Sequence, residues 1–267
     1  MQEFYHDNQE TGHAETSLSP DSAEYALERL RGIKSPSDIA RLSGNDVQIY
    51  PKPEPVDPVT TESNQAMFLS LFPNRFASCI KRGKDGGWRM TSQFHHLSDE
   101  EIVEAISGQA TFLRACMADV ETRFVTILLE ESSFYRSAEG LEKIRDCLRC
   151  LGINQFKLYT FEESEEWQLF AFFKRPVNSE KIAGQLSSWL RRNGIVPGTA
   201  GVRIFPGADP FCLPLQPGFT WINDNGQVIV CRNEVSSEAA LALFIADLER
   251  SDTDGEEVLA RLDQILS

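Results

Sequence analysis

Residues 123–131 read Arg-Phe-Val-Thr-Ile-Leu-Leu-Glu-Glu, and they carry the clearest structural signal in the chain. Its β-branched and large apolar side chains run without interruption from Phe124 to Leu129, which predicts a central strand buried on both faces. Acidic residues appear only at Glu130 and Glu131, where the strand leaves the core. Because strand ends often carry working residues, these glutamates are candidate functional residues. The alternative is a core strand that runs into a solvated turn.

Segments with strand and helix patterns follow one another on the C-terminal side of this stretch. We expect a strand over 123–130, a helix over 137–151, strands over 156–161 and 167–173, a helix over 178–193 and a strand over 202–205. This βαββαβ order predicts an α+β fold that contains a split βαβ, or RRM-like, unit. Elsewhere we expect helices over 65–71 and 98–107, hairpins over 76–93 and around 223–226, and two helices at the C-terminus.

Proline and hydrophobic patterns divide the chain into segments. Residues 1–18 are polar without a hydrophobic period and predict a disordered tail, whereas two Ser-Pro helix starts predict a helical hairpin over 19–44. Four prolines predict a stiff extended linker over 45–61. The main domain is then expected over 62–235, and the C-terminal helices over 236–267.

The net charge of −14, from 40 acidic and 26 basic residues, argues against phosphate binding over the whole surface. Positive charge gathers only around the hairpin at 76–93, which we call the basic hairpin. Its Gly86-Gly87 pair would let the backbone approach a strand of nucleic acid. A plain solvated hairpin is the alternative. The candidate nucleic-acid-binding residues are Arg75, Lys81, Arg82, Lys84, Trp88 and Arg89.

The composition also indicates which cellular compartment and which cofactors to expect. No apolar run is long enough to span a membrane and the N-terminus lacks signal-peptide features, so we expect a cytoplasmic protein with reduced cysteines. Cys147 and Cys150 have metal-ligand spacing, but they lie in a helical apolar pattern with no second pair. His95 and His96 directly precede a capping box that starts at Ser98, which predicts a solvated helix entrance. No metal and no cofactor are expected.

A series of short motifs between residues 65 and 235 resembles the archaeo-eukaryotic primase domain of TOTE conflict systems and related primase-polymerases. In chain order the motifs are LFPNRF at 71–76, KRGKDGGWRM at 81–90, LSDEEIVEAISG at 97–108, RFVTILLEES at 123–132, LGI at 151–153, LFAFFKRPV at 169–177, IFPGAD at 204–209, LPL at 213–215 and WINDNG at 221–226. The resemblance implies a primase-like fold. It also implies two-metal nucleotidyl transfer, in which converging carboxylates hold divalent cations.

This chain departs from the family at the positions that carry that chemistry. The resemblance places the Asp-x-Asp pair at Leu128 and Glu130, the phosphate-contacting His at Gln168 and the third acid at Arg203. Leucine cannot ligate magnesium, and one glutamate does not replace a carboxylate pair. The family's catalytic positions are therefore degenerate in this chain.

The turn that precedes Gln168 is also changed. Where the family has small and basic residues, this chain has four glutamates, which would repel a triphosphate rather than attract it. Asp209 remains downstream, and its position relative to a metal cannot be read from the sequence. The four glutamates are Glu162, Glu163, Glu165 and Glu166.

These substitutions predict a catalytically degenerate primase-like domain that acts as a nucleic-acid- or protein-binding accessory module in DNA replication, repair or defence. One alternative is an active DNA primase-polymerase that uses Mg or Mn at a site rebuilt from Glu130, Glu131, Glu162 and Asp209. Acids adjacent on a strand point to opposite faces, which disfavours that site and instead favours a solvated acidic edge. Another alternative is a purely protein-binding subunit that docks through its terminal helices.

Overall fold

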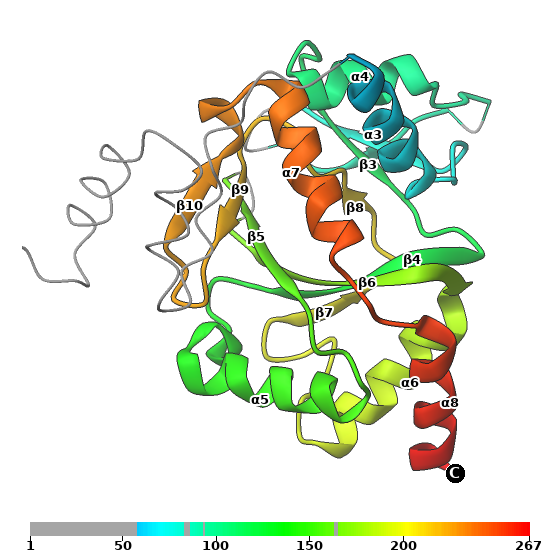
Figure 1. Ribbon diagram of the computed structural model, residues 1–267, viewed down its shortest axis with the longest axis vertical. Helices are drawn as coiled ribbons and strands as arrows, with labels where there is room; N and C mark the ends of the chain where they lie inside the picture. Colours follow the sequence, from blue (N-terminus) through cyan, green and yellow to red (C-terminus); the bar gives the residue numbers. More distant parts are fainter. Residues whose placement is uncertain (1–57, 83–85, 93, 163–164) are drawn as a thin grey trace, which may run out of the picture. The chain divides into compact units, whose positions relative to one another are not determined.

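Strand β4, Glu121–Leu129, is an interior strand of a six-stranded sheet, sheet B, whose order is β10-β9-β5-β6-β4-β7 (Figure 1). It pairs antiparallel with β6, Trp167–Asn178, and with β7, Val202–Phe205. All residues from Phe124 to Leu129 are buried. The prediction of a central strand covered on both faces is therefore confirmed.

The computed structural model describes residues 58–82, 86–92, 94–162 and 165–267. These residues belong to one compact unit, which includes the C-terminal helices. The predicted tail, the predicted helical hairpin and the linker up to residue 57 lie outside the described residues.

Antiparallel pairing continues through the rest of sheet B. β5, Lys157–Phe161, lies between β6 and β9, Phe219–Ile222, and β9 pairs with the edge strand β10, Val228–Cys231. The fold is mixed, with helices packed on antiparallel sheets. The elements from β4 to β7 occur in the predicted order.

A second sheet, sheet A, has four strands in the order β2-β1-β3-β8. The basic hairpin forms β1, Ser78–Lys81, and β2, Arg89–Met90, which are shorter than expected. β3, Leu113–Cys116, and β8, Phe211–Cys212, were not predicted, because neither has an alternating apolar pattern of useful length. β8 also lies in a proline-rich stretch, and proline is uncommon inside strands because it cannot donate to the ladder.

Helices α5, Ala138–Cys150, α6, Ser179–Arg192, and α8, Gly255–Leu266, cover one face of sheet B (Figure 1). Their apolar stripes pack against the β4 side chains of Val125 and Ile127 and their neighbours. No helix among the described residues combines the length and apolar composition that a membrane crossing requires.

Aromatic rings fill the opposite side of sheet B, where α7, Ser237–Glu249, packs. Phe124 of β4 stacks on Phe205 at 5.6 Å and on Phe170 at 5.2 Å between ring centroids. Successive side chains of a strand point to opposite faces of the sheet. Phe124, Thr126 and Leu128 of β4 therefore face the aromatic side, and Val125 and Ile127 face the helices α5, α6 and α8.

Helix α3, Pro58–Ser70, corrects the predicted linker. Residues 58–61 are helical because proline is well suited to the first turn of a helix, where its missing N–H is not needed. Helix α4, Asp99–Ser107, begins and ends as predicted, with a capping box from Ser98 to Glu101 and a left-handed Gly108 after it.

Candidate nucleic-acid-binding cleft

Leu128, Gln168 and Arg203 form one row across three adjacent strands. Leu128 on β4 is the direct partner of Gln168 on β6 and of Arg203 on β7. Direct cross-strand partners project on the same face of a sheet. The sheet therefore brings together the three positions that the resemblance assigns to the active site.

This row lies in a cleft of about 250 Å³ between sheet B and sheet A. Sheet B contributes the row itself, and sheet A contributes Lys81 of β1 and Leu113 of β3, which are direct partners. We refer to this space as the cleft. Its lining residues are Lys81, Trp88, Leu113, Leu128, Phe161, Glu166, Gln168, Arg203, Asp209, Pro210, Phe211 and Cys212.

Arg203 is surrounded by acids. Its guanidinium donates to Glu166 at 2.5 Å and to Asp209 at 3.4 Å. The Nε of Arg203 lies 3.8 Å from a carboxylate oxygen of Glu130. The guanidinium of Arg203 thus lies among the carboxylates on the sheet B wall of the cleft, and its positive charge offsets theirs.

Glu166 does not belong to a solvated acidic edge, which corrects the prediction for this residue. Its side chain is only 10% exposed, and a carboxylate oxygen lies 2.5 Å from the Arg203 guanidinium. Burial raises the pKa of Glu166, and the attraction of Arg203 offsets part of that rise. Glu162 and Glu165 are exposed, whereas Glu163 lies outside the described residues.

The cleft does not fit the pair of divalent metals that the resemblance implies. Leu128 has no ligand atom, and Arg203 places a positive charge beside the carboxylates that would have to approach a cation. Glu131 is exposed. Within the described ranges, no group of three or more His, Cys, Asp or Glu side chains is arranged to hold a metal ion.

We expect the stability difference between the wild type and Glu166→Gln to change with pH. The pKa of Glu166 is raised above 4.5 in the folded state, chiefly by burial, so the folded chain holds this proton more tightly than the unfolded chain. The wild type should therefore lose stability relative to the variant as pH rises from 4.5 through the raised pKa of Glu166. Urea unfolding of both proteins across this range measures the difference.

Measurements at more acidic pH provide the internal control for that experiment. Once Glu166 is protonated in both the folded and the unfolded chain, the difference should stop changing with pH. A difference that grows in the opposite direction above pH 4.5 would contradict the assignment of Glu166 as a buried, proton-retaining carboxyl group.

The predicted binding residues do not all share one surface. Lys81 and Trp88 line the cleft, Arg89 is exposed on β2, and Arg82 lies 5.8 Å from the ring centre of Phe112. Lys81 and Trp88 therefore belong to the cleft, whereas Arg89 lies on the adjacent strand β2, opposite Ile80 of β1. Lys84 lies outside the described residues.

Arg75, by contrast, is directed toward helix α4. It pairs with Asp99 at 2.8 Å, and its side chain is only 14% exposed. It also donates to the carbonyl oxygen of Leu69. Arg75 is therefore committed to contacts within the fold.

Three exposed apolar residues in the basic hairpin or directly after it were not predicted as functional. The exposed fractions are 62% for Phe76, 67% for Met90 and 85% for Phe94. Exposed aromatic faces beside positive charge suit stacking with the bases of a single strand. Their interleaving with basic residues was a signal that the sequence carried.

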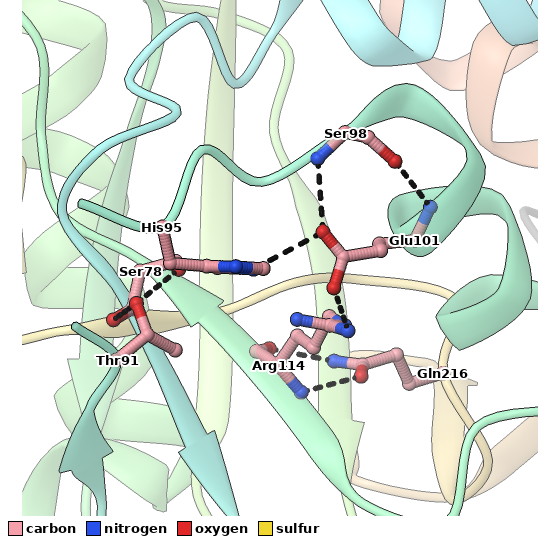
Figure 2. Close-up of polar contacts among 7 residues, drawn as sticks. All are labelled: Ser78, Thr91, His95, Ser98, Glu101, Arg114 and Gln216. Atoms are coloured by element: carbon pink, nitrogen blue, oxygen red, sulfur yellow. Dashed lines mark hydrogen bonds and ion pairs between the residues drawn. The ribbon is translucent and has the colours of Figure 1, made fainter.

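A polar network holds the sheet A wall of the cleft (Figure 2). Glu101 of α4 accepts from Arg114 of β3 at 2.6 Å, from the Ser98 backbone at 3.0 Å, and lies 3.1 Å from His95. His96 is exposed, as expected for a solvated helix entrance, whereas His95 is half-buried in this contact. The side chain of Gln216 bonds both the N–H and the carbonyl oxygen of Arg114, at 2.7 and 2.8 Å.

No protein-family model matches the chain, and no curated protein matches its sequence. Among solved structures, the chain is similar to the polymerase domain from Mycobacterium tuberculosis Ligase D, solved in complex with DNA. The two share 15% sequence identity over 76% of this chain and 95% of that chain, with a TM-score of 0.34. Similarity at this level carries no information about activity.

Proposed function

We propose that this chain is a catalytically degenerate primase-like module that binds single-stranded nucleic acid. The observation that carries the proposal is the row of Leu128, Gln168 and Arg203 in the cleft, with Arg203 paired to acids where the resemblance expects metal ligands. The order of elements from β4 to β7, with the strand order β5-β6-β4-β7, agrees with the RRM-like unit of that resemblance.

The binding surface in this proposal is the basic hairpin together with the rim of the cleft. Lys81, Arg82 and Arg89 supply positive charge on a chain that is otherwise strongly acidic. Phe94 and Trp88 supply aromatic faces beside that charge. Positive charge that follows a backbone and aromatic rings that stack with bases are the two features of sequence-tolerant single-strand binding.

We expect the protein to bind a primed single-stranded template weakly at low salt and not to extend the primer with Mg or Mn. Replacement of Lys81, Arg82 and Arg89 together by alanine should flatten the salt dependence of binding by about 2 units, because each phosphate contact to a single strand contributes about 0.7. Fluorescence anisotropy over a salt series, with the extension products run on a gel from the same mixtures, measures both.

The matched control removes the same number of positive charges from positions outside the basic hairpin and the cleft lining. Lys143, Lys174 and Arg191 are exposed on α5, β6 and α6, and their joint replacement by alanine should leave the salt slope unchanged. An equal change in both triple variants would mean that only net charge matters. Primer extension by the wild type would overturn the degenerate assignment, and no binding at low salt would leave docking to a protein as the function.

A further inference from the structure

We propose that the outer edge of β10 is a docking site for an extended segment of a partner protein, which joins sheet B as a further strand. The segment carries β-branched residues at its centre and Lys or Arg at its ends. This surface lies in a different sheet from the basic hairpin (Figure 1). The inference therefore goes beyond the proposed nucleic-acid-binding function and does not rest on it.

Three of the four sheet edges in the described residues have features that discourage the pairing of another strand. β2 is two residues long and includes Arg89, and β8, equally short, directly follows Pro210. β7 includes Arg203 and ends directly before Pro206. Short length, charged side chains and proline are common means by which proteins protect an edge strand.

The fourth edge, β10, lacks charge and proline. Its residues are Val228, Ile229, Val230 and Cys231. Val228 is 59% exposed, and the other three are half-buried. Among the residues that the structure describes, β10 pairs only with β9, so the outer side of its backbone has no neighbouring strand. An open edge of β-branched residues is the kind of surface to which an extended peptide adds.

Carboxylates lie at both ends of this edge. Asp224, which pairs with Arg145, is exposed in the turn before β10. At the other end, exposed Glu234 accepts from the Cys231 N–H at 3.1 Å. Burial raises the pKa of the Cys231 thiol, and the charges of Glu234 and Glu162 add to that rise, which indicates a negative potential here. Basic residues at the ends of an added segment would therefore be attracted.

The size and shape of the edge favour a separate segment over a second copy of this chain. Its four residues extend for about 13 Å, and contact along so short a strand stays below the roughly 1,000 Å² of a stable interface. A β-bulge leaves Ile229 without a direct partner on β9 and increases the local twist, which an extended segment can follow more easily than a folded edge. Two chains that each carry a net charge of −14 would also repel one another.

The first experiment measures binding of the full chain to a fluorescent peptide, Lys-Lys-Val-Thr-Val-Thr-Val-Lys-Lys, by anisotropy at low salt. One control peptide has Glu in place of every Lys. The other keeps the lysines but has Pro in place of the central Val, which removes a backbone donor. We expect both controls to bind at least tenfold more weakly, about 1.4 kcal/mol or more. Equal affinities of the lysine and proline peptides, or no binding of the lysine peptide, would overturn the proposal.

Val228→Lys tests the location of the site. The side chain is exposed, so thermal stability should be unchanged, whereas peptide affinity should fall about tenfold because lysine on an edge opposes pairing and repels the basic segment. Val120→Lys, at another exposed valine, and Val228→Thr, which keeps a β-branched side chain, are the matched controls. Both should bind within about twofold of the wild type. Wild-type affinity in a folded Val228→Lys protein would contradict the assigned edge.

The remaining measurements distinguish other occupants and separate this site from the proposed function. We expect sedimentation velocity to show a monomer, and a dimer that Val228→Lys dissociates would identify a second copy as the occupant and overturn the proposal. Val228→Lys should bind single-stranded DNA as the wild type does. Displacement of the peptide by single-stranded DNA would place the peptide on the nucleic-acid surface and remove the β10 site. Peptide binding without DNA binding would retain the β10 site and remove the proposed function.

Discussion

Asp247→Ala is expected to lower the free energy of unfolding by about 3–5 kcal/mol, the cost of leaving partners of a buried carboxylate unpaired. The Asp247 side chain is fully buried on α7. It accepts from Tyr159 at 2.9 Å and from Trp221 at 3.2 Å, and it lies 3.0 Å from Lys157 Nζ. One carboxylate thus ties α7 to β5 and β9. Urea unfolding measured by circular dichroism tests the size of the effect.

Two further variants of α7 provide the comparisons for that measurement. Asp247→Asn keeps an acceptor for Tyr159 and Trp221 but loses the charge opposite Lys157, so its cost should be smaller, about 1–2 kcal/mol. Glu249→Ala changes an exposed acid on the same helix and should stay within about 0.5 kcal/mol of the wild type. A cost for Asp247→Ala as small as that of Glu249→Ala would show that the buried network does not stabilise the fold.

Glu101→Ala is expected to cost about 3 kcal/mol, the second-largest effect. The change removes the half of the capping box in which the Ser98 N–H donates to the Glu101 carboxylate, whereas the backbone N–H of residue 101 still donates to Ser98 Oγ. It also leaves Arg114, whose side chain is 6% exposed, without its carboxylate partner (Figure 2). Because Arg114 lies on β3, the loss should also loosen the sheet A wall. Hydrogen exchange of the β1 and β3 amides, combined with urea unfolding, measures both consequences.

The contribution of Glu101 should depend on pH in a defined direction. Burial raises its pKa, but the Ser98 amide, Arg114 and His95 together outweigh burial and hold the pKa below 4.5. The stabilisation is therefore present above pH 4.5 and is lost as pH falls through the lowered pKa. Glu104→Ala, at an exposed position of the same helix, is the control and should cost little. A cost of Glu101→Ala that persists unchanged in strong acid would contradict this mechanism.

Helices and strands with a regular apolar period were predictable within a few residues. The spacing of apolar residues in α5 and α6 indicates which face of each helix is buried. The unbroken apolar run in β4 indicates that this strand is buried on both faces. β3 and β8 were missed because they are short and are stabilised by strands far away in the sequence. Their pairing leaves no local period to detect.

For the candidate site, the sequence identified the residue types but not their contacts. It placed leucine, glutamine and arginine at the positions where the resemblance expects metal and phosphate ligands. It did not show that Arg203 pairs with Glu166, because that contact depends on the register of β7 beside β4 and on the turn before β6. The sequence therefore predicts a solvated acidic turn, whereas one of its glutamates, Glu166, is buried.

By itself, the sequence determined the α+β class, the order of elements from β4 to β7, and the absence of a carboxylate pair at Leu128 and Glu130. These features depend on the chemistry and the periodicity of neighbouring side chains, which can be read from a short stretch of sequence. Tertiary packing determines that Gln168 has a buried unpaired oxygen, that Lys81 and Arg203 line one cleft, and that Asp247 is a core residue. Burial and pairing arise from segments that meet across long sequence separations, so no local pattern can encode them.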